Sequence, residues 1–213
     1  MKRHLTLSAA ALATVLALAG CATSENGTEA AAQTPAATST TIAADAEHNV
    51  EDTMFAQMMI PHHQQAVQMS EIMLSKENLD ARITDLATKI KEAQGPEIEK
   101  MNGFLQAWGE PGGTGAMEGH DTGSTESTMP GHDMSSMDGM MSEEDLAKLE
   151  AAEGAEAAKL FLTQMIAHHE GAVKMAEQEA AQGSNPQAVE LARAIVADQE
   201  GEIKQMQDLL KTL

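Results

Sequence analysis

Residues 55–71 read FAQMMIPHHQQAVQMSE, and residues 161–177 read FLTQMIAHHEGAVKMAE. Both segments place a phenylalanine, a methionine, a pair of histidines and an alanine-valine step at the same spacing. The likeness continues downstream, where the pattern Q-x-x-E-I-x-x-M recurs at residues 94–101 and 199–206. An internal repeat of this length indicates two copies of one structural unit.

Each copy has the periodicity of helices. Apolar residues recur three or four positions apart, and no useful length of sequence alternates with the period of two that a strand requires. We therefore predict an all-α fold of two helical hairpins, over residues 47–108 and 143–213. The four helices are expected near residues 47–76, 79–108, 143–182 and 186–212.

Capping residues support these boundaries. Ser142 with Asp145 forms an S-x-x-D start, and Asn185 before Pro186 supplies a cap and a first-turn proline. Asn78 is predicted to cap the second helix.

Two prolines fall inside predicted helices. Proline removes a backbone donor, so we expect a kink or break at Gly95-Pro96, which also makes the position of Met101 uncertain. Pro61, just before the first histidine pair, raises the same issue, although its counterpart is Ala167.

Composition excludes several classes of protein. The 213 residues hold 13 Lys and Arg against 33 Asp and Glu, a net charge of −20, with no basic block. Nucleic acids and anionic lipid headgroups are therefore excluded as partners. A single cysteine cannot form an intrachain disulfide or a thiolate zinc site. Sixteen methionines and only 2% aromatic residues predict an aliphatic, thioether-rich core.

The N-terminus reads as an export signal. Residues 1–20 hold a charged start, an apolar stretch and small residues, a secretory signal peptide too short to be read as a spanning helix. The ending LAGC at residues 18–21 resembles the bacterial lipobox, which implies a lipoprotein with a palmitate-type membrane anchor on Cys21. Plain secretion with an incidental cysteine is the alternative. Residues 21–46 are polar and small, as in a disordered tether.

Residues 109–142 separate the hairpins and are rich in Gly, Ser, Thr and Asp, which predicts a flexible linker. A spacer has no packing use for the methionines and histidines that this segment holds. We interpret it as an additional metal-binding segment, with a solvated spacer as the alternative. Its candidate ligands are His120, Met129, His132, Met134, Met137, Met140 and Met141.

The histidines of the repeat share a helix face with methionines. On a helical projection Met59 and His62 lie within about 60° of each other, on the side that should face the core. The second copy repeats the arrangement. Met101 and Met206 fall on the inner stripes of the partner helices, where core packing is the first interpretation and metal ligation the second.

This donor set favours copper. Thioether sulfur is a soft ligand and imidazole a borderline one, so Met and His without thiolate suit Cu(I) or Ag(I), and imidazole also accepts Cu(II). Zinc and iron would draw Cys or carboxylates. We predict metal ligation by His62, His63, His168 and His169, since burying four imidazoles costs free energy unless each finds a partner. The alternative is that these histidines form hydrogen bonds across a bundle core.

Catalysis is not indicated. A carboxylate-bridged di-iron site uses Glu-x-x-His on its helices, and no Glu stands three residues before any motif histidine. No nucleophile-base constellation is evident, and methionine-rich ligation disfavours a copper oxidase because it stabilises Cu(I). We therefore predict a non-enzyme, with a metal oxidase as the weakest alternative.

The motifs M-x-x-H-H-x-x-A-V-x-M and Q-x-x-E-I-x-x-M resemble a bacterial domain-of-unknown-function family, number 305, over residues 47–108 and 143–213. That resemblance implies a ferritin-like four-helix bundle, and copper binding as in some periplasmic members. Carried over by position, it implies these candidate ligands: Met59, His62, His63, Met69, Met165, His168, His169 and Met175.

The combined prediction is an extracytoplasmic lipoprotein, anchored to the cell membrane or outer membrane. It would sequester or shuttle copper in homeostasis or tolerance and hand it to a copper-transfer protein. The competing hypothesis is an envelope interaction or stress module whose Met and His are structural. Helix spacing leaves open whether the two copies form one metal site or two.

Overall fold

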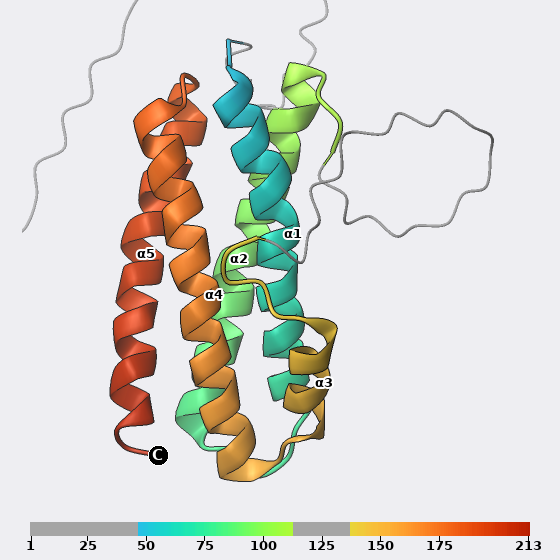
Figure 1. The fold of residues 1–213 in the computed structure, drawn as a ribbon, viewed down its shortest axis with the longest axis vertical. Coiled ribbons are helices and arrows are strands. Elements are labelled where there is room, and N and C mark those ends of the chain that lie inside the picture. Colours follow the sequence, from blue (N-terminus) through green and yellow to red (C-terminus); the bar gives the residue numbers. More distant parts are fainter. Residues whose placement is uncertain (1–46, 113–136) are drawn as a thin grey trace, which may run out of the picture. The chain divides into compact units, whose positions relative to one another are not determined.

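The computed structural model describes residues 47–112 and 137–213, and every regular element in these ranges is a helix (Figure 1). The helices are α1 (Val50–Leu74), α2 (Ala81–Trp108), α3 (Glu143–Ala151), α4 (Gly154–Gln182) and α5 (Pro186–Leu210). α1 packs along α2 and α4 along α5, while the hairpins meet mainly through α1 and α4. The predicted all-α four-helix bundle is confirmed, with α3 as an added short helix.

Two predicted helix caps are confirmed, and a third cap was not predicted. The Ser142 side chain accepts a hydrogen bond from the Asp145 amide at 3.2 Å and begins α3. Asn185 accepts from two amides of the first turn of α5, which opens with Pro186. In α1, Asn49 is the N-cap in a capping box. These side chains satisfy amides that have no partner within their own helix.

The prediction of one helix over residues 143–182 was wrong. Ala152 and Glu153 are extended, and they separate α3 from α4. Gly154 follows with φ of +53°, a left-handed conformation that glycine adopts at little cost. The break lets α3 lie across α1 and α4 and bury Leu149 in the core. Tertiary burial therefore outweighs the local continuity of the helix.

Two further local predictions differ from the structure. Asn78 does not cap the second helix: it has φ of +58°, and Asp80 is the cap, accepting from the Arg82 amide at 2.9 Å. The break that was one alternative at Gly95-Pro96 does not occur, because α2 runs continuously through Pro96. Gly95 makes this easier because it lacks the Cβ that clashes with a following proline ring. Pro61 likewise lies inside a continuous α1.

The core consists of two clusters, one toward each end of the α1–α4 contact. The first half of α1, with Phe55 and Met59, packs with Ala172 and Ala176 from the second half of α4. The second half of α1, with Met69, packs with the first half of α4. α1 and α4 are therefore antiparallel. Among the described residues, no helix is both long and apolar enough to cross a bilayer.

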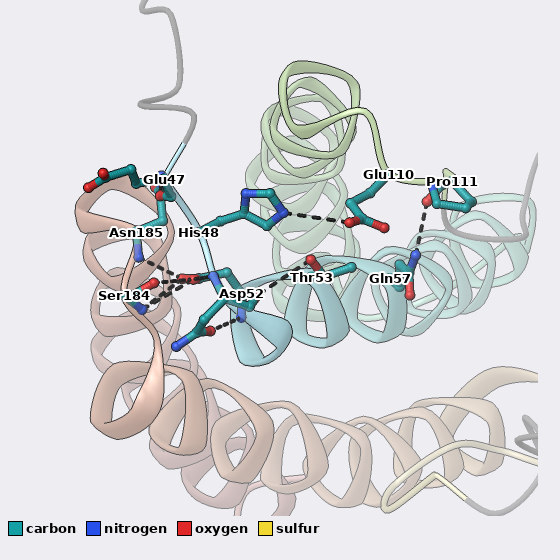
Figure 2. Close-up of polar contacts among 10 residues, drawn as sticks. Glu47, His48, Asp52, Thr53, Gln57, Glu110, Pro111, Ser184 and Asn185 are labelled. Atoms are coloured by element: carbon teal, nitrogen blue, oxygen red, sulfur yellow. Dashed lines mark hydrogen bonds and ion pairs between the residues drawn. The ribbon is translucent and has the colours of Figure 1, made fainter.

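One end of the bundle is joined by the carboxylate of Asp52 in α1 (Figure 2). It accepts hydrogen bonds from Ser184 Oγ at 3.0 Å and the Asn185 amide at 2.9 Å, both in the α4–α5 turn. Burial works to raise the pKa of Asp52, but hydrogen bonds from Asn49, Glu179, Asn185 and Ser184 hold it below its ordinary value. The ionised carboxylate thus fastens one hairpin to the other.

Candidate metal centre

The antiparallel packing of α1 and α4 brings the two histidine pairs together. The rings of His62 and His168 face each other with centroids 3.8 Å apart and planes tilted by 40°. His168 and His169 have ring centroids 6.3 Å apart. Each of the four side chains is buried. The copies of the repeat therefore contribute their histidines to one cluster.

A glutamate from the partner helix contacts one histidine of each pair. His63 Nε2 donates to Glu97 Oε2 at 2.8 Å, from α1 to α2. His169 Nε2 donates to Glu202 Oε2 at 2.8 Å, from α4 to α5. These two contacts obey the same approximate two-fold relation as the sequence repeat. Each histidine is thus held to its own hairpin by a carboxylate.

The central pair is uncharged at neutral pH. Burial, together with the neighbouring His63 and His169, lowers the pKa of His62 to about 3, against a weaker raising contribution from the Asp138 carbonyl. Burial, together with the neighbouring His62, His169 and His63, lowers the pKa of His168 well below its ordinary value. A neutral imidazole has one nitrogen lone pair available to a metal ion.

Five ring nitrogens of the cluster are buried without a hydrogen-bond partner. They are Nδ1 of His62, His63, His168 and His169, and Nε2 of His168. A buried polar atom without a partner costs about 1–3 kcal/mol, so five in one place need a physical explanation. A metal ion would explain up to four of them, because each neutral imidazole offers one lone pair, and the imidazole and thioether donors present suit a soft ion.

Thioether groups lie in the core on both sides of the histidines. Met59 and Met175 share one hydrophobic cluster, and Met69 and Met165 share the other. Met59 and Met165 precede their histidine pairs in sequence, whereas Met69 and Met175 follow theirs. Each hydrophobic cluster therefore holds one methionine of each kind. Three of the four are fully buried, and Met175 is half-buried.

Met101 and Met206 are also fully buried, one in each hydrophobic cluster. Their predicted place on the inner stripes is confirmed, and continuous helical geometry through Pro96 removes the uncertainty about Met101. A role for either as a ligand stays a prediction. In residues 47–112 and 137–213, His, Cys, Asp and Glu side chains form no group of three or more that could hold a metal ion by themselves.

Residues 137–141, here called the strap, run over the histidine cluster. The carbonyl oxygen of Asp138 accepts from His62 Nε2 at 3.3 Å. The Gln65 side chain makes two hydrogen bonds with the backbone of Met141, at 2.9 and 2.7 Å. A Cβ built on Gly171 would lie 1.9 Å from Asp138 O, so only glycine admits the strap there. Met137, Met140 and Met141 are half-buried within it.

The remaining sequence predictions lie outside the described residues. They concern the linker ligands His120, Met129, His132 and Met134, the lipidation site Cys21, the signal peptide 1–20 and the tether 21–46.

Sequence reasoning missed several residues that shape the centre. Glu97 and Glu202 occupy the same position in both copies of the downstream motif, and this recurrence was the signal that could have identified them. Gln65 and Gly171 also occupy equivalent positions, but they differ because the strap crosses only one side of the approximate two-fold axis. No local pattern could have predicted that asymmetry.

Solved structures resemble this chain over most of its length. A DUF305 fragment from Deinococcus radiodurans is 30% identical, with a TM-score of 0.64, over 78% of this chain and 98% of that chain. A DUF305 protein from Streptomyces coelicolor, described as secreted, is 31% identical, with a TM-score of 0.64 and coverages of 76% and 91%. CopM in its Cu(I)-bound form is 28% identical, with a TM-score of 0.58 and coverages of 76% and 96%.

CopM is also similar in its Cu(II)-bound, Ag-bound and apo forms. A comparison with curated proteins finds no match. The family model for a domain of unknown function, DUF305, matches residues 52–210, which cover nearly all of the four long helices of the bundle and both histidine pairs. This chain therefore belongs to the DUF305 family.

Proposed function

We propose that this protein binds copper outside the cytoplasm, and that it sequesters or shuttles the metal in copper homeostasis or tolerance. The observation that carries the proposal is the cluster of four buried histidines with five unpartnered ring nitrogens. Methionine sulfur in the adjoining hydrophobic clusters completes a donor set of imidazole and thioether. The proposed ligands are those of the repeat: Met59, His62, His63, Met69, Met165, His168, His169 and Met175.

The chemistry of these donors favours Cu(I) over other metals. Soft thioether ligands stabilise the reduced ion, and neutral imidazole binds both Cu(I) and Cu(II). The low pKa values of His62 and His168 support binding, because no proton has to leave either ring at neutral pH. CopM, a similar protein solved with Cu(I), Cu(II) and Ag, supports the same class of metal.

Binding without catalysis is the proposed role. A protein that carries a soft metal needs buried donors and a way to pass the ion on, and a copper-transfer protein is the partner we propose. The signal-like residues 1–20 support an extracytoplasmic location, as does the similar protein from S. coelicolor described as secreted. A lipid on Cys21 would hold the protein at the membrane surface.

The test is an anaerobic titration of the full chain with Cu(I) against a competing chelator, comparing wild type with His168→Ala. Neither ring nitrogen of His168 has a hydrogen-bond partner. Truncation to alanine therefore removes a proposed ligand without breaking a hydrogen bond. His48→Ala, which removes a histidine beside Trp108 and away from the centre, is the matched control.

We expect His168→Ala to weaken Cu(I) binding at least tenfold and His48→Ala to leave it unchanged. Far-ultraviolet circular dichroism checks that each variant folds. Equal affinity in wild type and His168→Ala would contradict the proposal. It would favour the alternative in which the buried histidines only support an envelope interaction module.

A further inference from the structure

We propose that Nδ1 is the metal-binding nitrogen of His62, His63 and His169, and that Glu97 and Glu202 are positioning residues that hold it ready. The inference rests on the proposed function and specifies its donor atoms.

The two glutamates determine which nitrogen of His63 and His169 carries the proton. A neutral imidazole has one N–H and one lone pair, on different nitrogens. A carboxylate accepts, so Nε2 carries the hydrogen where it lies 2.8 Å from Glu97 or Glu202. The lone pair is then on Nδ1. In both rings this atom is buried without a partner.

His62 reaches the same state through a different partner. Its Nε2 lies 3.3 Å from the backbone oxygen of Asp138, and a carbonyl oxygen can only accept a hydrogen bond. The lone pair of His62 is therefore also on Nδ1, again buried and unpartnered. The Asp138 carbonyl of the strap thus accepts the Nε2–H of His62, as the Glu97 carboxylate accepts that of His63. His168, with neither nitrogen bonded, is left free to bind through either atom.

The two nitrogens of each of these rings also face different parts of the bundle. Glu97 and Glu202 are about one-fifth exposed, at 19% and 21% of their side-chain surface, whereas the His63 and His169 side chains are fully buried. The bonded nitrogens therefore point to the rim of the bundle, and Nδ1 remains inside. A histidine that donates its second N–H to a carboxylate is fixed in orientation and becomes a more basic ligand.

Loss of such a partner usually weakens metal binding about 10- to 100-fold. We therefore expect Glu97→Ala and Glu202→Ala each to reduce Ag(I) affinity by that factor. Glu97→Gln should retain much of the affinity, because an amide oxygen also accepts from Nε2–H. The matched controls are Glu99→Gln and Glu200→Gln, which make the same charge change at exposed sites on α2 and α5.

The decisive readout is the ¹⁵N chemical shift of the ring nitrogens in the full-length, ¹⁵N-labelled wild-type protein, from long-range ¹H–¹⁵N correlation spectra. Ag(I) serves as the probe because it is diamagnetic and has the charge and soft character of Cu(I). Before metal is added, Nε2 of His62, His63 and His169 should be protonated and Nδ1 should carry the lone pair. On addition of Ag(I), Nδ1 should show the shift and the coupling to silver.

The outcomes separate this inference from the proposed function. If the wild type binds neither Ag(I) nor Cu(I), the proposed function fails, while the tautomers of the apo protein remain readable. Silver coupling at Nε2 of any of the three rings would overturn the inference alone. Undiminished affinity in Glu97→Ala and Glu202→Ala would overturn the positioning role, whereas loss restored by Glu97→Gln supports it.

Discussion

His62 on α1 and His168 on α4 are 106 positions apart in sequence, yet their ring centroids are separated by only 3.8 Å. The contact exists because α1 and α4 are antiparallel and each carries its histidine pair near the middle of their shared interface. Both rings are buried, and the rings of their sequence neighbours are each tied to a glutamate. Four imidazoles thus form one cluster, with core methionines on both sides.

The methionines should matter for metal affinity and little for folding. We predict that Met69→Leu combined with Met165→Leu weakens Cu(I) binding at least tenfold, because a soft donor is lost from each copy of the repeat. Each substitution should lower the stability by less than about 1.5 kcal/mol, since leucine nearly conserves side-chain volume. Chelator competition and urea unfolding measure the two effects. Met58→Leu, just outside the motif spacing, is the control, and equal affinity in both variants would contradict the prediction.

Gly171 should be irreplaceable where the strap crosses α4. Gly171→Ala places a methyl group 1.9 Å from the backbone oxygen of Asp138, so the strap or the helix must shift. We predict a clear loss of thermal stability, despite the higher helix propensity of alanine. Gly201→Ala is the matched control: apart from its chain neighbours and its own helix backbone, nothing lies within 4 Å of the added Cβ, and it should stabilise α5 by about 0.5–1 kcal/mol. A Tm for Gly171→Ala at or above wild type would refute the steric argument.

Gln65 should hold the strap in place. Its amide group bonds both the N–H and the C=O of Met141, and Gln65→Ala removes both contacts. We predict faster hydrogen exchange at the Met141 amide. In the variant, local opening of the strap no longer has to break these two hydrogen bonds. Gln68→Ala, on the exposed face of the same helix, should leave this exchange rate unchanged. Protection of Met141 that survives Gln65→Ala would mean that other contacts hold the strap.

The fold should become less stable at alkaline pH, where Glu179 loses its proton. Burial, together with hydrogen bonding to Asp52 and the charges of Asp52 and Glu51, raises the pKa of Glu179 to about 8. The folded state therefore holds a proton that the unfolded chain releases above an ordinary value of 4.5. The resulting stabilisation is fully present below that value and is lost as the pH rises through about 8.

The measurement is the free energy of unfolding in urea at about pH 6 and about pH 9, on either side of that pKa. Wild type should lose stability over this range, and Glu179→Gln, which cannot ionise, should lose less. Glu177→Gln, exposed on the same helix, should behave as wild type does. Parallel losses in wild type and Glu179→Gln would show that another group titrates.

The sequence alone determined the helical class, the two-fold repeat and the residues of the histidine pairs. Periodicity of apolar residues and helix caps such as Ser142 and Asn185 are local properties, and they were read correctly. Soft donors without thiolate likewise indicated the chemistry of copper. These inferences need only residue types and spacings within one helix.

Only the tertiary structure decided how the copies combine. The contact of His62 with His168, the glutamates behind His63 and His169, and the strap all join residues far apart in the chain. The break after α3 also depends on burial of Leu149 against other helices, which outweighs local helix propensity. Such relations arise from packing between elements, where the free energy of burial selects one arrangement among many that the same local pattern allows.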